Sequence, residues 1–536
     1  MKNGRGIGVV TRRSFVSAAG VAALATGVVG HSAVAHAAEG NGQSFDETYD
    51  VVVVGYGFAG AMAAIAASDE GAKVLLCDSA PEGEEGGNSR FCAQIVVYGQ
   101  DRDKLRQYYQ GLGQEMDQDP DVLDAYVDGL MGVPDIFKRM GIEDPCIWSE
   151  FAATAEGEAG SGGNDETDAQ KIKRSFKAIC PEYPEVEGSD TVDAVTMHPA
   201  YFDGAFYPVV QQNVQASESI TVWLESPAKH LIQDADGAVT GVIIEHDGGD
   251  VRVGANGGVV LACGGFECNR KMIQDFIGVP RLTPIGGMHN NGDGIRMAQE
   301  VGADLWHMHN YESLGMFGGN QYEVEDGQRC TLMLSARFRP SVKGAIICVA
   351  DDGSRFLRED QIDRHGHLYN HGIWRIPNTA SHPHMVFDEA QKAVLEENGH
   401  MPLNVDDVIV SAQTAEELAG KIGADPDILA RTIERFNGYA QSGEDVEFGR
   451  DPEYMRAFEG TLYALPLEPS VLNTQGGPRR NAKAQVVDTD GNPIPHLYSA
   501  GECGGVNAFY YQGGGNVGEC LVFGKIAGTN AADGAK

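Results

Sequence analysis

The sequence predicts a protein of the α/β class, and three observations support that prediction. An apolar, β-branched run at Val51–Val54 is followed by closely spaced glycines, an alanine-rich helical stretch and a second apolar run at Val74–Cys77. A second glycine-rich stretch near the C-terminus leads into another predicted helix, which begins near Asn516. Between Trp306 and Glu459 this strand–glycine–helix rhythm is lost. The 536 residues are enough for two domains, or for one domain with a large insertion.

The charge balance excludes one class of partner. The chain has 40 basic and 77 acidic residues, a formal net charge of −37. Phosphate backbones and anionic membrane surfaces would be repelled by such a protein. We therefore expect no nucleic-acid partner, and we interpret the excess of acidic residues as a solvated surface.

The N-terminus resembles an export signal. Paired arginines, Arg12 and Arg13, precede a short apolar run, and small residues at Ala35 and Ala37 follow it. This pattern is similar to a twin-arginine signal over residues 1–37, which directs folded proteins out of the cytoplasm. No later run is long and apolar enough to span a membrane. We expect an exported protein, in the periplasm or at the extracytoplasmic face, without stable membrane insertion.

The ten cysteines show no recognisable metal or haem motif. They are scattered, with no CxxC and no CxxCH. We predict no metal site and interpret the cysteines as packing thiols, although a cluster of cysteines distant in sequence stays open.

The first glycine motif predicts a dinucleotide site. Gly55, Gly57 and Gly60 form GxGxxG between two predicted strands, with Phe58 and Ala59 at the start of the helix. The glycines let the backbone approach a pyrophosphate at the helix N-terminus. An acidic residue, Asp78, ends the second strand and can accept hydrogen bonds from ribose hydroxyls.

Three later stretches indicate which dinucleotide is bound. "EEGGNSRFCAQ", "GGVVLACGGFECN" and "IPHLYSAGECGGVNAFYYQGGGNVGECLVFGKIAG" together resemble the FAD-binding flavoprotein family of fumarate reductases, urocanate reductases and 3-ketosteroid dehydrogenases. The resemblance implies a split, Rossmann-like FAD domain (46–305 and 460–536) with an inserted α+β capping domain (306–459). It also implies FAD contacts from Gly87, Asn88, Ser89, Gly264, Gly265, Asp293, Gly501, Glu502, Asn516 and Val517.

The C-terminal helix has a physical reason to face the flavin. A helix N-terminus carries about half a positive charge and stabilises an anionic reduced flavin. We expect Gly513–Gly515 to let the backbone pass close to the flavin ring.

The substrate-facing segments differ from those of fumarate reductases. The resemblance places a carboxylate-binding histidine at Asn473 and an arginine at Gln512. Neutral amides replace both cations, which disfavours a dicarboxylate substrate.

A tyrosine four residues before a glycine resembles the carbonyl-binding pair of the ketosteroid dehydrogenases. Tyr511 and Gly515 have that spacing, and Tyr510 is the alternative by one residue. A hydroxyl and a backbone N–H would stabilise the oxygen of an enone while hydride reaches its β-carbon. The alternative is that both tyrosines are packing residues.

Proton delivery is expected from the segment "DGSRFLREDQIDRHGHLYNHG". It resembles a family segment that ends in a proton-donating arginine, although gapless alignment places Asp363 there and Arg364 one residue later. We predict Arg364 as donor within a relay, with His365 and Tyr369 as substitutes. A solvated or ion-paired Arg364 is the alternative, and His307 and His309 are further candidates.

These features predict an exported FAD-dependent reductase of an activated C=C bond, conjugated to a ketone in a steroid-like or aromatic molecule. The alternatives are a ketosteroid-type dehydrogenase, an organic-acid reductase of the fumarate or urocanate type, and a non-catalytic flavin protein. No haem or FMN attachment motif is visible, so we expect a separate electron-transfer partner, such as a cytochrome c or a quinol-linked membrane protein. We also predict a surface loop at 153–188 and a helix from Asp425 to Gly443.

Overall fold

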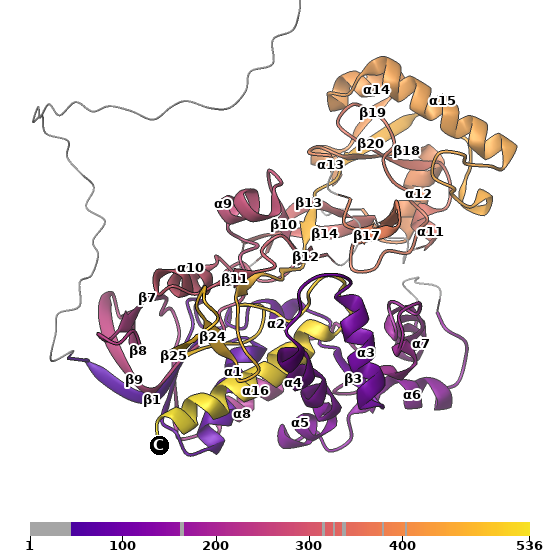
Figure 1. Ribbon diagram of the computed structural model, residues 1–536. Helices are drawn as coiled ribbons and strands as arrows, with labels where there is room; N and C mark the ends of the chain where they lie inside the picture. The colour runs from indigo at the N-terminus through magenta and orange to yellow at the C-terminus, as the bar shows by residue number, and fades with distance from the viewer. Residues whose placement is uncertain are drawn as a thin grey trace, which may run out of the picture. The chain divides into compact units, whose positions relative to one another are not determined.

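Strands from both ends of the chain pair in one eight-stranded sheet. The computed structural model describes residues 44–160, 166–313, 317–324, 327–334, 339–377, 380–401 and 405–536. β1 (Glu47–Val54) pairs in parallel with β2 (Val74–Cys77) and β9 (Gly249–Leu261), and β25 (Pro493–Ser499) joins the other side of β9. Figure 1 shows the indigo N-terminal strands and the yellow C-terminal helix in the same part of the molecule. The other strands of this sheet are β6 (Ile220–Trp223), β7 (Ala228–Gln233), β8 (Val239–His246) and β24 (Gln485–Val487).

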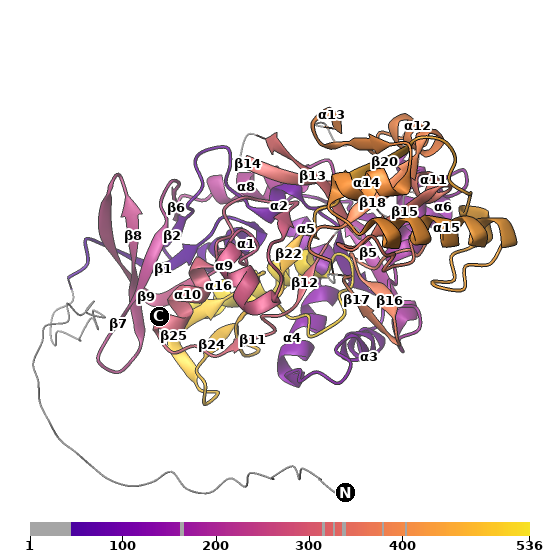
Figure 2. The same ribbon diagram turned by 90° about the horizontal axis from the view of Figure 1, so that it is seen from above.

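Two helices from opposite ends of the chain pack against each other beside this sheet. The valines of β1 are almost fully buried, as expected for a parallel strand that is covered on both faces. α1 (Phe58–Asp69) and α16 (Gly515–Gly534) lie side by side in Figures 1 and 2. A Cβ at Gly528 would overlap the carbonyl oxygen of Ala63, so this glycine permits the close approach of the two helices.

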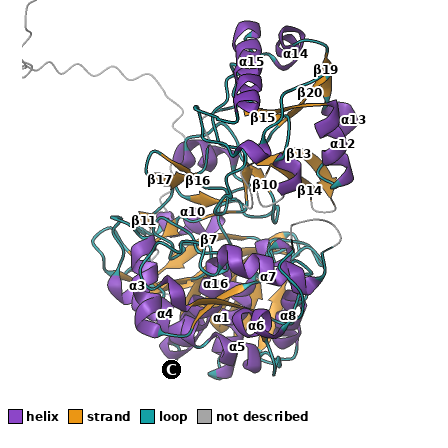
Figure 3. Ribbon diagram, turned by 90° about the vertical axis from the view of Figure 1, so that its right-hand side faces the viewer, coloured by secondary structure: helices purple, strands orange, loops and turns teal. Residues whose placement is uncertain are grey.

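A helical layer with a small antiparallel sheet completes this part of the molecule. β5 (Val192–Thr196) pairs with β3 (Val96–Gly99) and β4 (Cys146–Ile147). Figure 3 shows helices of this part gathered around its strands. The helices are α2 (Asn88–Phe91), α3 (Arg102–Leu112), α4 (Pro120–Met131), α5 (Val133–Arg139), α6 (Trp148–Thr154), α7 (Asp168–Ile179), α8 (Phe206–Gln215), α9 (Arg270–Met272) and α10 (Asp293–Glu300).

The prediction of a surface loop at 153–188 is wrong for its second half. α7 begins with a capping box between Thr167 and Gln170, and Ile172 and Ile179 are buried. The acidic, glycine-rich stretch before Thr167 obscured this helical pattern in the sequence.

Short ladders connect the outgoing and returning chains between the large sheet and the inserted segment. The outgoing strands β10 (Thr283–Pro284), β11 (Leu305–Trp306) and β12 (Tyr311–Glu312) each pair with a strand of the returning chain. Their partners, in the same order, are β21 (Ser470–Val471), β23 (Gly477–Pro478) and β22 (Asn473–Thr474). A hairpin of β13 (Phe317–Val324) and β14 (Gly327–Leu334) follows.

Residues 339–467, here called the insertion, contain a second sheet. Its strand order is β15 (Ile346–Val349), β18 (His384–Asp388), β20 (Leu462–Pro466) and β19 (Val410–Ala412), all antiparallel. Alternate residues of β15 enter two different hydrophobic clusters, as the twofold side-chain period of a strand requires. The remaining elements are α11 (Arg339–Val342), β16 (Leu368–Asn370), β17 (Ile373–Arg375), α12 (Glu389–Glu397), α13 (Val405–Val408), α14 (Ala415–Ile422) and α15 (Pro426–Ser442).

The C-terminal boundary of the insertion differs from the predicted one, whereas the helix predicted within it is present. β20 lies after Glu459 in sequence, yet it is an inner strand of the insertion sheet. The expected helix is confirmed: the Asp425 side chain accepts from the Ile428 N–H, and Gly443 ends α15 with φ of 74°.

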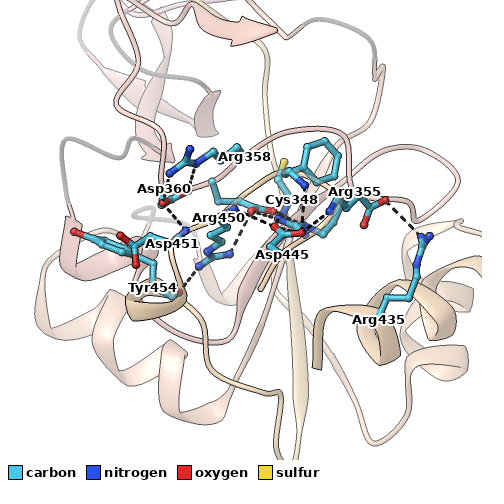
Figure 4. A network of polar contacts seen from close by, with 12 residues as sticks. Cys348, Arg355, Arg358, Asp360, Arg435, Asp445, Arg450, Asp451 and Tyr454 are labelled. Atoms are coloured by element: carbon cyan, nitrogen blue, oxygen red, sulfur yellow. Dashed lines mark hydrogen bonds and ion pairs between the residues drawn. The ribbon is translucent and has the colours of Figure 1, made fainter. Parts of the chain in front are cut away.

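A buried ion network lies inside the insertion (Figure 4). Arg355 bonds to Glu359 at 2.7 Å and to Asp445 at 3.1 Å, and Arg450 bonds to Glu359 at 3.2 Å. Arg450 also donates to the carbonyl oxygens of Val342 and Ile346, both at 2.6 Å. These side chains are nearly or fully buried, so each charge depends on its partners for solvation.

The predicted export signal, residues 1–37, lies outside the described residues. Among the residues that the structure describes, no helix combines the length and apolar character that a membrane span needs.

Candidate functional site

A large cavity opens where β1, β2 and β9 end. Its volume, counting the open solvent at its mouth, is about 1180 Å³. The carboxyl ends of parallel strands are where α/β sheets bind ligands. Of the predicted cofactor residues, those that line the cavity are Gly55, Gly57, Phe58, Ala59, Asp78, Gly87, Asn88, Ser89, Gly264, Asp293, Gly501, Glu502, Asn516 and Val517.

The N-terminus of α1 forms one wall of the cavity. Gly55 has φ of 104°, which turns the chain from β1 into the helix, and Gly57 is an N-cap without a side-chain hydrogen bond. The Phe58 N–H donates to the Ser89 Oγ at 2.9 Å, which leaves the Ser89 hydroxyl hydrogen free to donate. Uncapped helix N–H groups and a nearby hydroxyl suit a phosphate group.

Asp78 lies at the end of β2, as the motif predicts. Its carboxylate accepts from the N–H groups of Tyr56 at 2.6 Å and Ala80 at 2.8 Å. Burial raises the pKa of Asp78, and these two hydrogen bonds lower it. Lone pairs remain on both oxygens for ligand hydroxyls.

Two predicted cofactor glycines do not line the cavity. A Cβ at Gly60 would overlap the carbonyl oxygen of Gly55, so this glycine allows α1 to pack closely on β1. A Cβ at Gly265 would overlap the Thr474 hydroxyl and lie 2.7 Å from Glu502. Both glycines therefore lie behind the cavity wall, where the absence of a side chain lets neighbouring groups pack closely.

Two carboxyl groups, Glu267 and Glu502, meet in the cavity wall. The Asn88 amide donates to Glu267 at 2.7 Å and to Glu502 at 3.0 Å, and the Thr474 N–H donates to Glu502 at 2.9 Å. Burial, and then the charge of Glu267, raise the pKa of Glu502 well above its usual range. Burial also raises the pKa of Glu267. Both shifts favour the protonated form of this pair of carboxyl groups.

α16 places a second uncapped helix N-terminus at the cavity. Gly514 is its N-cap, with φ of 84° and no side-chain hydrogen bond, and Asn516 and Val517 line the cavity. The glycine triplet also lies close to protein groups. Gly513 packs against His365, and Gly515 packs against Tyr126.

Tyr511 is the predicted catalytic residue that faces the cavity. Its hydroxyl oxygen accepts from the Asn516 N–H at 3.4 Å, which leaves the hydroxyl hydrogen free to donate. Burial raises the pKa of Tyr511 well above its ordinary value, so the hydroxyl stays protonated. Behind it, the His365 ring stands edge-on at a centroid distance of 4.7 Å, and His365 Nδ1 lies 2.8 Å from a Glu182 oxygen.

The other predicted catalytic residues do not line the cavity. The Tyr510 ring stacks on Tyr183, and its hydroxyl accepts from the Trp374 N–H at 3.2 Å. The Gly515 N–H donates to the carbonyl oxygen of Gln512 at 2.9 Å.

Arg364 has strong interactions of its own. It makes a bidentate ion pair with Glu185, at 2.5 and 3.1 Å, and its guanidinium lies 3.8 Å from the centre of the Trp374 ring. The sequence left two interpretations of Arg364 open, a proton donor or an ion-paired residue. The structure shows the ion pair.

The two amides that replace the fumarate reductase cations have different environments. Asn473 lines the cavity, and its amide donates to the Thr474 carbonyl at 3.2 Å. Gln512 is fully buried and fully bonded: it accepts from the Tyr108 hydroxyl at 2.6 Å and donates to the Ile179 carbonyl at 2.6 Å. Gln512 therefore supports the structure rather than contacting a ligand.

The remaining candidates are also placed away from the cavity. Burial lowers the pKa of His307 to about 4, so its ring is neutral at physiological pH. His309 lies beside it, with ring centroids 6.1 Å apart. Tyr369 is largely exposed, and Asp363 is buried and accepts from the Gly366 N–H at 3.1 Å.

This fold and cavity are those of a dinucleotide-binding protein. Two helix N-termini and a protonated hydroxyl at the wall fit a ligand that combines phosphates with a redox ring. The chain belongs to the family described as FAD binding domain, whose model matches residues 50–517. Its cofactor is FAD, and it is a flavoprotein oxidoreductase of the fumarate reductase and 3-ketosteroid dehydrogenase class.

The chain is similar to characterised proteins over nearly its whole length. A digoxin reductase of Eggerthella lenta is 26% identical over 98% of this chain and 97% of its own length. A 3-oxosteroid 1-dehydrogenase of Mycobacterium tuberculosis is 27% identical over 91% of this chain and 99% of its own length. The open conformation of a flavocytochrome c3 fumarate reductase superposes with a TM-score of 0.65 at 25% identity, covering 92% of this chain and 79% of that one.

Three buried glutamates near the cavity were missed by sequence reasoning. Glu182 lies in the segment predicted as a surface loop, Glu312 lies outside every recognised motif, and Glu267 lies within "GGVVLACGGFECN" without having been assigned a role. Glu267 is two residues after the glycine pair of "GGFECN", and this position could have indicated a residue beside the cavity wall. Nothing in the local sequence distinguishes Glu182 or Glu312 from a surface glutamate.

Proposed function

We propose that this protein reduces a C=C bond conjugated to a ketone, in a steroid-like or aromatic small molecule. Bound FAD, once reduced, supplies a hydride to the β-carbon of the substrate. The Tyr511 hydroxyl donates a hydrogen bond to the substrate carbonyl, where negative charge develops as the hydride arrives. The observation on which the proposal rests is that Tyr511 presents a protonated hydroxyl at the cavity wall, while Asn473 and Gln512 offer no cation.

The neighbouring charges also support a neutral substrate. Glu182 lies behind Tyr511, and Arg364 is neutralised by Glu185. The neutral amides of Asn473 and Gln512 offer a substrate carboxylate no charge-assisted hydrogen bond. The 3-oxosteroid 1-dehydrogenase is named for a substrate that carries a ketone, in agreement with this proposal.

Reoxidation of the reduced protein tests the substrate class. The purified protein is reduced anaerobically with dithionite and mixed with panels of enones, enoates and cinnamates, while flavin absorbance is followed. Fast reoxidation by enones alone supports the proposal. Fast reoxidation by the acids indicates an organic-acid reductase, and oxidation of saturated ketones coupled to an artificial acceptor indicates a dehydrogenase. A flavin that reacts with none of them indicates a non-catalytic protein.

We propose that FAD is held non-covalently. Four cysteines line the cavity. Burial raises the pKa of Cys77, Cys92 and Cys520, that of Cys92 to about 11, so the nucleophilic thiolate form of these residues is scarce. Acid precipitation of the yellow protein is expected to release all flavin into the supernatant. Colour that stays with the washed precipitate would contradict this proposal.

We propose export through the twin-arginine route and electron supply by a separate partner. Changing both Arg12 and Arg13 to Lys should retain the protein inside the cell with FAD bound, because this route reads the arginine pair and acts on folded proteins. Cell fractionation and flavin absorbance measure the two properties. Undiminished export of the double variant would indicate another route.

A further inference from the structure

The buried carboxyl group of Glu182 connects three segments that meet beside Tyr511. Glu182 follows α7 in the chain. It accepts from the Gly513 N–H at 3.0 Å, and His365 Nδ1 lies 2.8 and 2.9 Å from its two oxygens. His365 belongs to the insertion, so one side chain links the segment after α7, the glycine triplet and the insertion.

The residue that directly follows Tyr511 is bonded to the same segment. The Glu182 N–H donates to the side-chain oxygen of Gln512 at 3.1 Å, and the Gln512 amide donates to the carbonyl oxygen of Ile179 at 2.6 Å. The next residue, Gly513, donates to the Glu182 side chain. Both residues that follow Tyr511 are therefore fixed by the end of α7 and the residues just after it.

The Tyr511 hydroxyl is held only loosely by its own hydrogen bond. That bond, from the Asn516 N–H, is long at 3.4 Å. The Tyr511 ring packs against the His365 ring, with centroids 4.7 Å apart and planes at 89°. The direction of the hydroxyl therefore depends on the His365 ring and on the backbone that follows Tyr511, and Glu182 bonds to both.

We propose that Glu182 is a positioning residue that aims the Tyr511 hydroxyl at the substrate carbonyl, acting through His365 and Gly513. This inference rests on the proposed reduction of a conjugated C=C bond. The two hydrogen bonds to Glu182 hold ring and backbone in place, because breaking either would leave a buried polar group unpaired. A displacement of about 1 Å of a reacting group can cost a large part of its effect on the rate. Glu182 itself is not among the residues that line the cavity.

Two substitutions at Glu182 separate its hydrogen bonds from its packing. Glu182→Met keeps the length of the side chain and removes both acceptors, whereas Glu182→Gln keeps an oxygen for the Gly513 N–H and an amide for His365. We expect Glu182→Met to slow single-turnover reoxidation of the dithionite-reduced protein about tenfold, with FAD content unchanged. Glu182→Gln should retain most of the wild-type rate. A wild-type rate for Glu182→Met, or a Gln variant as slow as the Met variant, would overturn the proposal.

A double-mutant cycle asks whether Glu182 acts through the Tyr511 hydroxyl. Once Tyr511→Phe has removed that hydroxyl, Glu182→Met has no donor left to misplace, so the double variant should be no slower than Tyr511→Phe alone. Multiplied losses would show that Glu182 acts elsewhere. A near-native rate for Tyr511→Phe beside a slow Glu182→Met would show the same. Either result would overturn the inference.

The dependence of the rate on acceptor concentration separates positioning from binding. The hydrogen bond from Tyr511 strengthens as charge develops on the carbonyl oxygen, so its misplacement should lower the limiting rate at saturating acceptor. The half-saturating concentration should stay near the wild-type value. A change confined to that concentration would assign Glu182 to substrate binding. His365→Ala, which leaves the bond from Gly513 to Glu182 in place, should also lower the limiting rate, and a wild-type rate for it would contradict a role of the ring in orienting Tyr511.

The acceptor in these experiments is the compound that reoxidises the wild-type protein fastest. An enoate in that place would defeat the proposed substrate class, and the comparison of variants would still decide whether Glu182 acts through Tyr511. Glu185→Met is the matched control, because Glu185 lies three residues later, is half-exposed and pairs with Arg364 of the insertion. It should reoxidise at the wild-type rate. A tenfold loss in this control as well would show that any weakened contact between this segment and the insertion slows the reaction, and would overturn the specific role of Glu182.

Discussion

Replacing Tyr511 with phenylalanine is expected to slow reoxidation of the reduced protein by enones about a hundredfold or more. The substitution removes the hydroxyl that faces the cavity and keeps the ring, which packs edge-on against His365. Losing one donor to a developing oxyanion costs roughly 3 kcal/mol in the transition state. FAD content should not change, because the lost hydrogen bond, from the Asn516 N–H, is long at 3.4 Å. Stopped-flow absorbance of the flavin measures the rate.

Tyr510→Phe is the matched comparison. The Tyr510 hydroxyl bonds to the Trp374 backbone and lies outside the residues that line the cavity. Its loss should alter the rate far less than the loss of the Tyr511 hydroxyl. A near-native rate for Tyr511→Phe together with a large loss for Tyr510→Phe would show that the alternative tyrosine binds the carbonyl. Near-native rates for both variants would contradict the hypothesis that a tyrosine hydroxyl binds the substrate ketone.

Replacing Glu359 with glutamine is expected to cause the largest loss of stability, about 3–5 kcal/mol. Glu359 is fully buried in the insertion and accepts from two arginines, Arg355 at 2.7 Å and Arg450 at 3.2 Å. The neutral amide cannot balance these charges, and one of its ends would present N–H groups to a guanidinium. Removing one partner of a buried ion network leaves uncompensated charge in a medium that solvates it poorly. The midpoint of urea denaturation and the rate of proteolysis within residues 339–467 measure the effect.

An exposed ion pair of the same insertion provides the control. Arg435 and Glu447 are 3.7 Å apart, and the arginine side chain is 51% exposed. Arg435→Ala should change stability by less than about 1 kcal/mol, because water solvates both charges. Equal losses for Glu359→Gln and Arg435→Ala would contradict the assignment of a buried, mutually dependent network.

The local sequence predicted the cofactor site because its parts are close together in the chain. Gly55, Gly57 and Asp78 belong to one strand–helix–strand unit, whose chain geometry brings them to the same end of the sheet. The helix from Asp425 to Gly443 was predictable for the same reason, since caps act within one turn. Predictions failed where local composition conflicted with distant packing, as in the acidic stretch before α7.

The sequence by itself therefore predicted an α/β flavoprotein, most of the residues that line the cavity, and a tyrosine that the structure places at the cavity wall. Only the tertiary structure decided which tyrosine reaches the cavity, that Arg364 is paired with Glu185, and that Glu182 pairs with the histidine that packs against Tyr511. These residues come from separate segments, and their protonation depends on burial and on partners brought together by folding. Spacing along the chain fixes local geometry, whereas burial and charge pairing arise from contacts between distant segments.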